Sequence, residues 1–210
     1  MDIHPIEIQL RNVQHYIINF QLHTCVAVLA MFIAVSCTPK EKAHEHGAVA
    51  IDSLPVLRMV GVFDGIDHHG KPLTSESLRG KLWLGSFFFA RCESICPALN
   101  TVQSALQRDF SDRLLFVSIT TDPDNDTPEV LHAYADQFGA KDNVWWFVNM
   151  SHSKMLDLAS NGLGLISPTS PEMHSTRFVL VDSAMQVRGY YDSADTADVS
   201  KLRGILAGVR

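Results

Sequence analysis

Two cysteines four residues apart are the residues of this chain best suited to chemistry. They lie in the segment Arg91-Cys92-Glu93-Ser94-Ile95-Cys96-Pro97, directly after a run of apolar residues. Pro97 suits the first turn of a helix, so we expect Cys96 at a helix N-terminus, where backbone N–H groups favour a thiolate. Arg91 adds a positive charge beside the pair. Two thiols placed in this way can form a disulfide or hold a soft metal ion.

The spacing Cys-x-x-x-Cys leaves two interpretations open. Positions four apart share a helix face, so both sulfurs can point at one external atom, and the longer ring changes the strain of a disulfide. The alternative is two buried structural cysteines, because Cys is among the most buried residue types. The polar residues Glu93 and Ser94 and the adjacent Arg91 favour a partly exposed, reactive pair.

The pattern of apolar residues predicts the elements that must position these thiols. Strands are predicted at residues 56–63, 82–89, 114–119, 143–149, 176–181 and 186–191, and helices at 97–110, 126–138, 151–161 and 195–206. A turn at residues 67–72 closes an N-terminal hairpin. This order indicates an α/β domain with a mixed central sheet flanked by helices. A cysteine pair that leads a helix after a buried strand is typical of the thioredoxin-like fold.

His174 is the other candidate for chemistry. It follows a loop signature at residues 168–173 and precedes a strongly apolar strand. Thioredoxin-like sheets bring the loop before that strand near the cysteine turn, where an imidazole could join two thiolates as a third ligand. Soft thiolates select Cu(I), and an imidazole also suits Cu(II). Taken alone, a histidine in a loop is more often a surface residue.

Other polar residues receive structural interpretations. Asp126 is expected to cap the helix that follows it, with Pro128 in the first turn. The acidic loop before that helix fits turn formation better than a hard-metal site, since the EF-hand spacing is absent. His68 and His69 lie in a predicted turn, where we expect both to be solvated.

The bulk properties exclude some classes of protein. The net charge is −6 and no cluster of Lys and Arg stands out, which argues against a nucleic-acid binder. The 210 residues fit one domain plus appendages, and four cysteines are too few for a disulfide-stapled scaffold.

The N-terminal segment predicts export. Residues 1–36 are interpreted as a signal peptide or membrane anchor, because residues 25–36 form an apolar run too short for a comfortable membrane span. The string Ile33-Ala34-Val35-Ser36-Cys37 resembles a bacterial lipobox, in which Cys37 becomes lipidated. Residues 37–54 are then a linker and residues 55–210 the domain. Both interpretations tether the domain to a membrane, facing the periplasm or cell exterior of a bacterium.

Four stretches of the chain resemble the Sco/SenC family of copper proteins. They are Cys-x-x-x-Cys-Pro at 92–97, Thr-Thr-Asp-Pro at 120–123 with Asp-Thr-Pro at 126–128, Met-His-Ser at 173–175, and Gly-Tyr-Tyr-Asp at 189–192. Together they extend over nearly the whole domain in family order. The chain departs from the family at Glu93-Ser94, where Pro-Asp is common, and at Arg91.

The resemblance implies a thioredoxin-like fold and a copper site made of Cys92, Cys96 and His174. It also implies a role in assembling the CuA centre of cytochrome c oxidase, by delivering copper as Cu(I) or Cu(II) or by reducing thiols. The implied partners are the CuA-bearing subunit or another copper acceptor, a thiol reductant and the membrane. The alternative is a thiol-disulfide oxidoreductase that uses Cys92 and Cys96 to reduce the cysteines of exported proteins. A peroxiredoxin-like peroxidase and a copper sensor rank below both.

Overall fold

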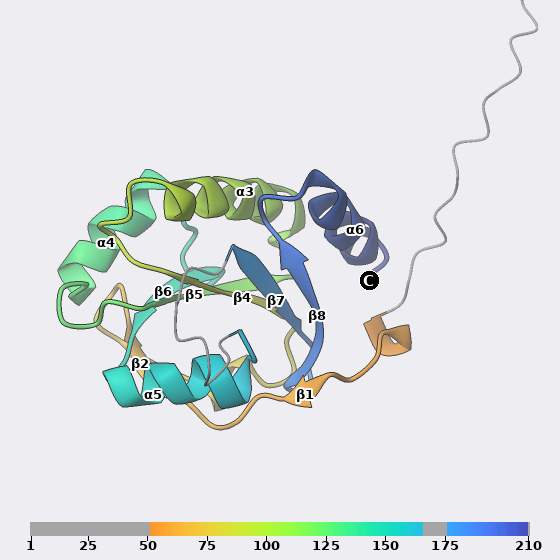
Figure 1. The fold of residues 1–210 in the computed structure, drawn as a ribbon, viewed down its shortest axis with the longest axis horizontal. Coiled ribbons are helices and arrows are strands. Elements are labelled where there is room, and N and C mark those ends of the chain that lie inside the picture. The colour runs from red at the N-terminus through yellow and green to blue at the C-terminus, as the bar shows by residue number, and fades with distance from the viewer. Residues whose placement is uncertain (1–50, 166–175, 210) are drawn as a thin grey trace, which may run out of the picture. The chain divides into compact units, whose positions relative to one another are not determined.

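One mixed sheet organises the domain (Figure 1). The computed structural model describes residues 51–165 and 176–209. Within them the strands are β1 (Arg58–Met59), β2 (Asp64–Asp67), β3 (Pro72–Thr74), β4 (Trp83–Phe88), β5 (Leu115–Thr120), β6 (Trp145–Asn149), β7 (Arg177–Val181) and β8 (Gln186–Asp192). Their order in the sheet is β1-β8-β7-β4-β5-β6-β2-β3. The pairs β4–β5 and β5–β6 are parallel and the other pairs are antiparallel, which confirms the predicted α/β class and mixed sheet.

Helices cover both faces of the sheet. They are α2 (Ser75–Leu78), α3 (Ile95–Phe110), α4 (Pro128–Gln137), α5 (His152–Asp157) and α6 (Thr196–Ala207), with short helices η1 (Ile51–Ser53) and η2 (Leu158–Gly162). In Figure 1, α3, α4 and α6 lie above the sheet and α5 lies below it. No helix of the described residues is both long and apolar enough to cross a membrane.

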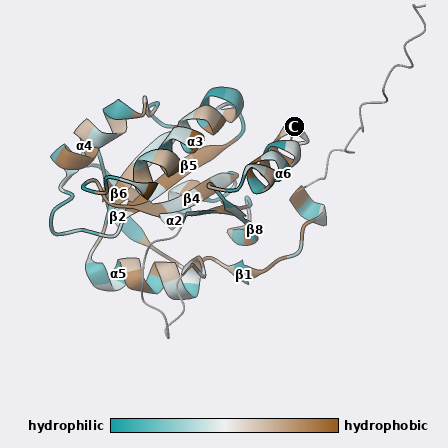
Figure 2. Cartoon of the chain, turned by 45° about the horizontal axis from the view of Figure 1, so that its top comes forward, coloured by the Kyte–Doolittle hydropathy of each residue, from teal (hydrophilic) through white to brown (hydrophobic). Residues whose placement is uncertain are grey.

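The central strand β4 is buried along its whole length, because both of its faces are covered. Successive side chains of a strand point to opposite faces, and β4 shows this alternation. Leu84 and Phe88 belong to the hydrophobic cluster that α3, α4 and α6 cover, whereas Trp83 and Phe87 belong to the cluster under α5. Figure 2 shows hydrophobic colouring on central strands such as β5 and β6, whereas the helices alternate between hydrophilic and hydrophobic residues.

A group of polar side chains lies within the layer that α3, α4 and α6 cover, and these side chains are fully buried. Ser86 of β4 donates to Gln103 Oε1 of α3 at 2.9 Å, and Gln103 Nε2 donates to Ser118 Oγ of β5 at 3.1 Å. Trp145 Nε1 of β6 also donates to Ser118 Oγ, at 2.9 Å. Because buried polar groups are costly unless they are hydrogen-bonded, this network fixes α3 against the three parallel strands.

The predicted strand at residues 56–63 is confirmed only at Arg58 and Met59, because residues 60–63 form no strand and β2 begins after them. Arg58 and Met59 pair with β8 at one edge of the sheet, whereas β2 pairs with β6 near the other edge. One straight strand cannot pair at two distant edges, so the chain crosses the lower face between them. The other predicted strands and helices are confirmed to within a few residues, and Gly139, which follows α4, adopts the left-handed conformation common after helix ends (φ 63°).

The buried network leads to a first prediction. Ser118→Ala leaves Trp145 Nε1 and Gln103 Nε2 without their acceptor, so we expect a loss of about 1–3 kcal/mol in the free energy of unfolding. Urea denaturation followed by tryptophan fluorescence measures this loss. The matched control is Ser153→Ala, whose hydroxyl is exposed and should leave stability unchanged. Equal stability of the two variants would contradict the assigned network.

Candidate metal centre

The two cysteines lie where β4 leads into α3. Cys92 is in the turn after the strand, and Cys96 is the second residue of α3, so its predicted position at a helix N-terminus is confirmed. Pro97 occupies the first turn, where its missing N–H costs nothing. The backbone N–H of Cys96 donates to Cys92 Sγ at 3.4 Å. The turn thus brings both thiols together without joining them in a disulfide.

Burial of the pair corrects one expectation. Cys92 is 8% exposed and Cys96 is 5% exposed, and both pack in the cluster that contains Phe88 and Tyr134. From the sequence, the polar residues Glu93 and Ser94 indicate a partly exposed cysteine pair. In the structure these two residues are exposed, whereas both cysteines are buried. Both thiols are therefore largely buried among apolar side chains.

The two thiols have pKa values shifted in opposite directions. Burial alone raises the pKa of Cys92, but hydrogen bonds from the Cys96 thiol and from backbone N–H groups at the start of α3 bring it below the ordinary value. Burial raises the pKa of Cys96 to about 12, and the hydrogen bond with Cys92 adds to this rise. The site therefore holds one thiol that ionises readily beside one that keeps its proton.

Asp126 is a site residue that sequence reasoning assigned to another role. Its predicted capping role is wrong, because Thr127 is the N-cap residue of α4 and its side chain accepts from Val130 N. Asp126 is instead fully buried, and its Oδ2 accepts from Ala90 N at 3.1 Å and from the Thr120 hydroxyl. Its Oδ1 has no hydrogen-bond partner. Asp126 therefore holds the turn that contains Cys92 against the end of β5. Its charge also helps to raise the pKa of Cys96.

The loop that carries Asp126 is itself held to the sheet. Asn149 Nδ2, at the end of β6, donates to the carbonyl oxygens of Pro123 and Asp126 at 2.8 and 2.7 Å. Arg91 Nε donates to Asp122 Oδ2 at 3.2 Å, so its guanidinium is directed to this loop. Arg91 therefore forms an ion pair with Asp122 that joins the two loops of the site, and its charge does not face the thiols as the sequence led us to expect.

The start of β7 lies at the same end of the sheet as the thiols. β7 runs antiparallel to β4, with Gly85 opposite Val179 and Trp83 opposite Val181. The residue that begins β7, Arg177, therefore lies at the end of β4 from which the chain leads to Cys92. His174 and Cys37 lie outside the described residues, so their predicted roles as copper ligand and lipidation site remain predictions.

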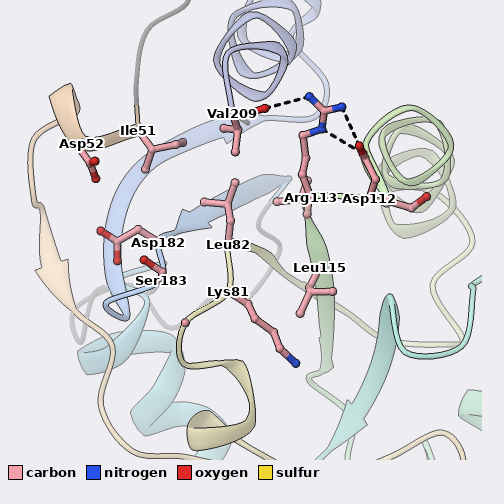
Figure 3. A pocket seen from close by; sticks show the side chains of 13 residues that line it. Ile51, Asp52, Lys81, Leu82, Asp112, Arg113, Leu115, Asp182, Ser183 and Val209 are labelled. Carbon is pink, nitrogen blue, oxygen red and sulfur yellow. Dashed lines mark hydrogen bonds and ion pairs between the residues drawn. The ribbon is translucent and has the colours of Figure 1, made fainter.

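A cavity of about 640 Å³ lies at the opposite end of the sheet (Figure 3). It is lined by residues that precede β4, begin β5 or follow β7, among them Lys81, Leu115 and Asp182. Arg113 closes one side and donates to Asp112 and to the carbonyl oxygen of Val209. This cavity contains none of the predicted site residues and is separate from the thiol site.

The unequal pKa values predict unequal reactivity. In the reduced protein we expect iodoacetamide to modify Cys92 first, because the thiolate is the reactive form. The rate at Cys92 should reach half of its maximum at a lower pH than for an ordinary thiol, whereas folded Cys96 should react only at much higher pH. Peptide mass spectrometry after timed quenching measures both rates. Faster modification of Cys96 would contradict the assigned hydrogen bonds.

Asp126 gives a second prediction for this region. Asp126→Ala leaves the Ala90 N–H and the Thr120 hydroxyl without an acceptor, so we expect a loss of about 1–3 kcal/mol in the free energy of unfolding. Asp124→Ala in the same loop is the control, since this side chain is exposed and should change stability by less than about 0.5 kcal/mol. Denaturant titration measures both variants, and an equally stable Asp126→Ala would refute the anchoring role.

The chain is similar to proteins of one family. Residues 52–146 match the SCO1/SenC family model. The SCO1 protein homolog of Bacillus subtilis is 28% identical over 149 residues, which cover 67% of this chain and 77% of that protein. A solved structure of BsSco, described as a member of the Sco family of cytochrome c oxidase assembly proteins with a disulfide switch, superposes with a TM-score of 0.64 and 25% identity over 73% of this chain and 94% of that one.

A further solved structure agrees in fold. Arabidopsis thaliana ScoI with copper bound superposes with a TM-score of 0.59 and 23% identity, over 71% of this chain and 97% of that one. These neighbours have the thioredoxin-like fold expected from the sequence, and the cysteine turn described above lies within the region that the family model matches. Residues 52–146 thus resemble the SCO1/SenC family, and one solved relative of this chain, BsSco, is described as a member of a family of cytochrome c oxidase assembly proteins.

Proposed function

We propose that this protein is a copper chaperone that holds copper through Cys92, Cys96 and His174. The observation that carries the proposal is the pair of buried, neighbouring thiols at the start of α3, one with a lowered pKa and one with a raised pKa. Thiolate sulfur is the ligand type that selects Cu(I). Copper is the cargo of this site rather than a permanent cofactor.

The topology supports His174 as the third ligand. The chain enters β7 at the end of the sheet where β4 leads to Cys92, and His174 precedes β7 by three residues. An imidazole is compatible with both Cu(I) and Cu(II), so three ligands of this kind could hold either oxidation state. The Arabidopsis relative, whose structure contains copper, supports copper as the metal.

The pKa values define how copper binds and leaves. Metal ligation needs deprotonated thiols and a neutral imidazole, so acid weakens binding. Cys92 ionises first and can bind copper at once, whereas Cys96 must lose its proton as the metal arrives. An oxidised Cys92–Cys96 pair cannot bind copper in this way, so the redox state of the pair controls loading.

A thiol-disulfide oxidoreductase is the second candidate function. One observation favours it: a readily ionised thiol beside a protonated one is the arrangement of a nucleophilic and a resolving cysteine. Attack by Cys92 on an exported protein's disulfide would form a mixed disulfide. Cys96 would then release the reduced substrate and leave the pair oxidised, and an external thiol reductant would restore it.

The cellular setting belongs to the same proposal. The acceptor is the CuA-bearing subunit of cytochrome c oxidase or another copper acceptor, as BsSco's description as an assembly protein supports. A lipid on Cys37, or an uncleaved anchor, would hold the domain at a bacterial membrane and face it to the periplasm or the cell exterior. This location would bring the copper site to acceptors outside the cytoplasm.

Anaerobic copper titration tests the proposal. The reduced full chain should bind one Cu(I), and Cys92→Ser, Cys96→Ser and His174→Ala should each weaken binding by at least about tenfold, because each removes one ligand. Affinity measured against a Cu(I) chelator should also fall as the pH is lowered from 8 to 5, because protons compete for the ligands.

Two outcomes would contradict the chaperone. Unchanged affinity in His174→Ala would remove this residue from the site. No tight copper binding, together with rapid disulfide exchange that needs only the two cysteines, would favour the oxidoreductase. His152→Ala is the matched control, since this exposed histidine lies in α5 on the other face of the sheet.

A further inference from the structure

Three histidines from two distant segments lie together at the end of the N-terminal hairpin. His68 and His69 form the turn between β2 and β3, and His132 lies in α4, which contacts β2. The ring centroid of His69 lies 4.1 Å from that of His68 and 5.4 Å from that of His132. One nitrogen of each ring lies within 4.8 Å of the others.

Hydrogen bonds fix the turn that carries two of these rings. Asp67 Oδ1 accepts from the backbone N–H groups of His69 and Lys71, both at 2.9 Å. Gly70 N donates to the carbonyl oxygen of Asp67, and Gly70 adopts a left-handed conformation (φ 73°) that few other residues tolerate. The positions of His68 and His69 relative to α4 are therefore set by the backbone.

His68 corrects a second expectation from the sequence, because it is buried rather than solvated. It is only 5% exposed, and its Nδ1 accepts a hydrogen bond from Phe147 N at 3.2 Å. Burial lowers the pKa of His68, and the neighbouring His69 lowers it further, which favours a neutral ring. Because Nδ1 accepts this hydrogen bond, the neutral ring carries its proton on Nε2, so His68 offers no free lone pair to a metal and packs against the other two rings instead.

The two exposed rings are better prepared to bind. Asp142 Oδ1 lies 3.2 Å from His69 Nε2, so a proton on that nitrogen is donated to a carboxylate and the lone pair remains on Nδ1. Carboxylate–histidine pairs of this kind orient the ligating ring in many metal sites. His132 has a looser contact of the same kind, with Asp136 Oδ2 at 3.9 Å from its Nε2.

Space for an ion and additional ligands is present beside the rings. The three histidines line an open cavity of about 400 Å³ together with Gly70, Pro128 and Glu129. Glu129 and His132 are three residues apart in α4, so they share a helix face. Tetrahedral Zn²⁺ with bonds of about 2.0–2.1 Å places its ligand atoms about 3.3 Å apart, so small side-chain rotations suffice to close the site.

We propose that His69 and His132 bind a divalent transition-metal ion of the class that prefers imidazole, such as Zn²⁺ or Cu²⁺. These two nitrogen ligands leave positions for water and the Glu129 carboxylate, while His68 packs behind them. This histidine site uses none of the thiols, so it stands independently of the copper site proposed above. It gives the domain a second place for a metal that prefers nitrogen to sulfur ligands.

Zinc binding tests the histidine site. The full chain carrying Cys92→Ser and Cys96→Ser, which removes the thiol site, is titrated with Zn²⁺ in competition with a chromophoric chelator. We expect His69→Ala and His132→Ala, made in this background, each to weaken one Zn²⁺ site by at least about tenfold, and Asp142→Asn to weaken it by about tenfold. His69 and His132 lie at the surface, so circular dichroism should show both variants folded.

His152→Ala is the matched control and should bind Zn²⁺ like its parent. Titration with Co²⁺ provides a second measurement, because a site with nitrogen ligands produces visible absorption bands that the His69→Ala and His132→Ala variants should lose. Zn²⁺ affinity that is the same in His69→Ala, His132→Ala and the parent would overturn the proposal, since any remaining site would then lie elsewhere in the chain.

Discussion

The buried carboxylate of Asp126 is the constraint on which the thiol site depends. A turn that follows a central strand has no neighbouring strand to hold it, so its backbone groups need other partners. Asp126 supplies one by accepting from Ala90 N, and its contact with the Thr120 hydroxyl ties the same carboxylate to the end of β5. Asn149 extends this connection to β6. Three parallel strands thus contribute to the position of Cys92.

This arrangement explains why two identical side chains differ in chemistry. Cys92 faces the free N–H groups at the start of α3, which stabilise negative charge. Cys96 is the second residue of α3, and its thiol is buried and within the electrostatic influence of Asp126. The pKa difference arises from the burial of Cys96, from the hydrogen bond between the two thiols and from the N–H groups at the start of α3, with a smaller contribution from Asp126. It therefore does not require a charged side chain such as Arg91 next to the thiols.

Much of this could be predicted from the sequence, and the failures have physical causes. The apolar run of β4 and Pro97 after it were enough to place Cys96 at a helix start. The segment Asp126-Thr127-Pro128 offers two residues that can cap a helix, and only the tertiary fold decides that Thr127 caps while Asp126 turns inward. The burial of His68 depends on α4 and Phe147, which are distant in the sequence.

The two edge strands of the sheet determine how another protein can approach. Within the described residues, β1 has two residues and β3 has three, one of which is Pro72. Edges this short offer few free backbone groups, so a second chain cannot extend the sheet by adding a strand, and aggregation by this route is suppressed. In the proposed copper transfer, recognition of the acceptor would therefore rely on side chains and loops rather than on backbone pairing, and such contacts are easily reversed after the transfer.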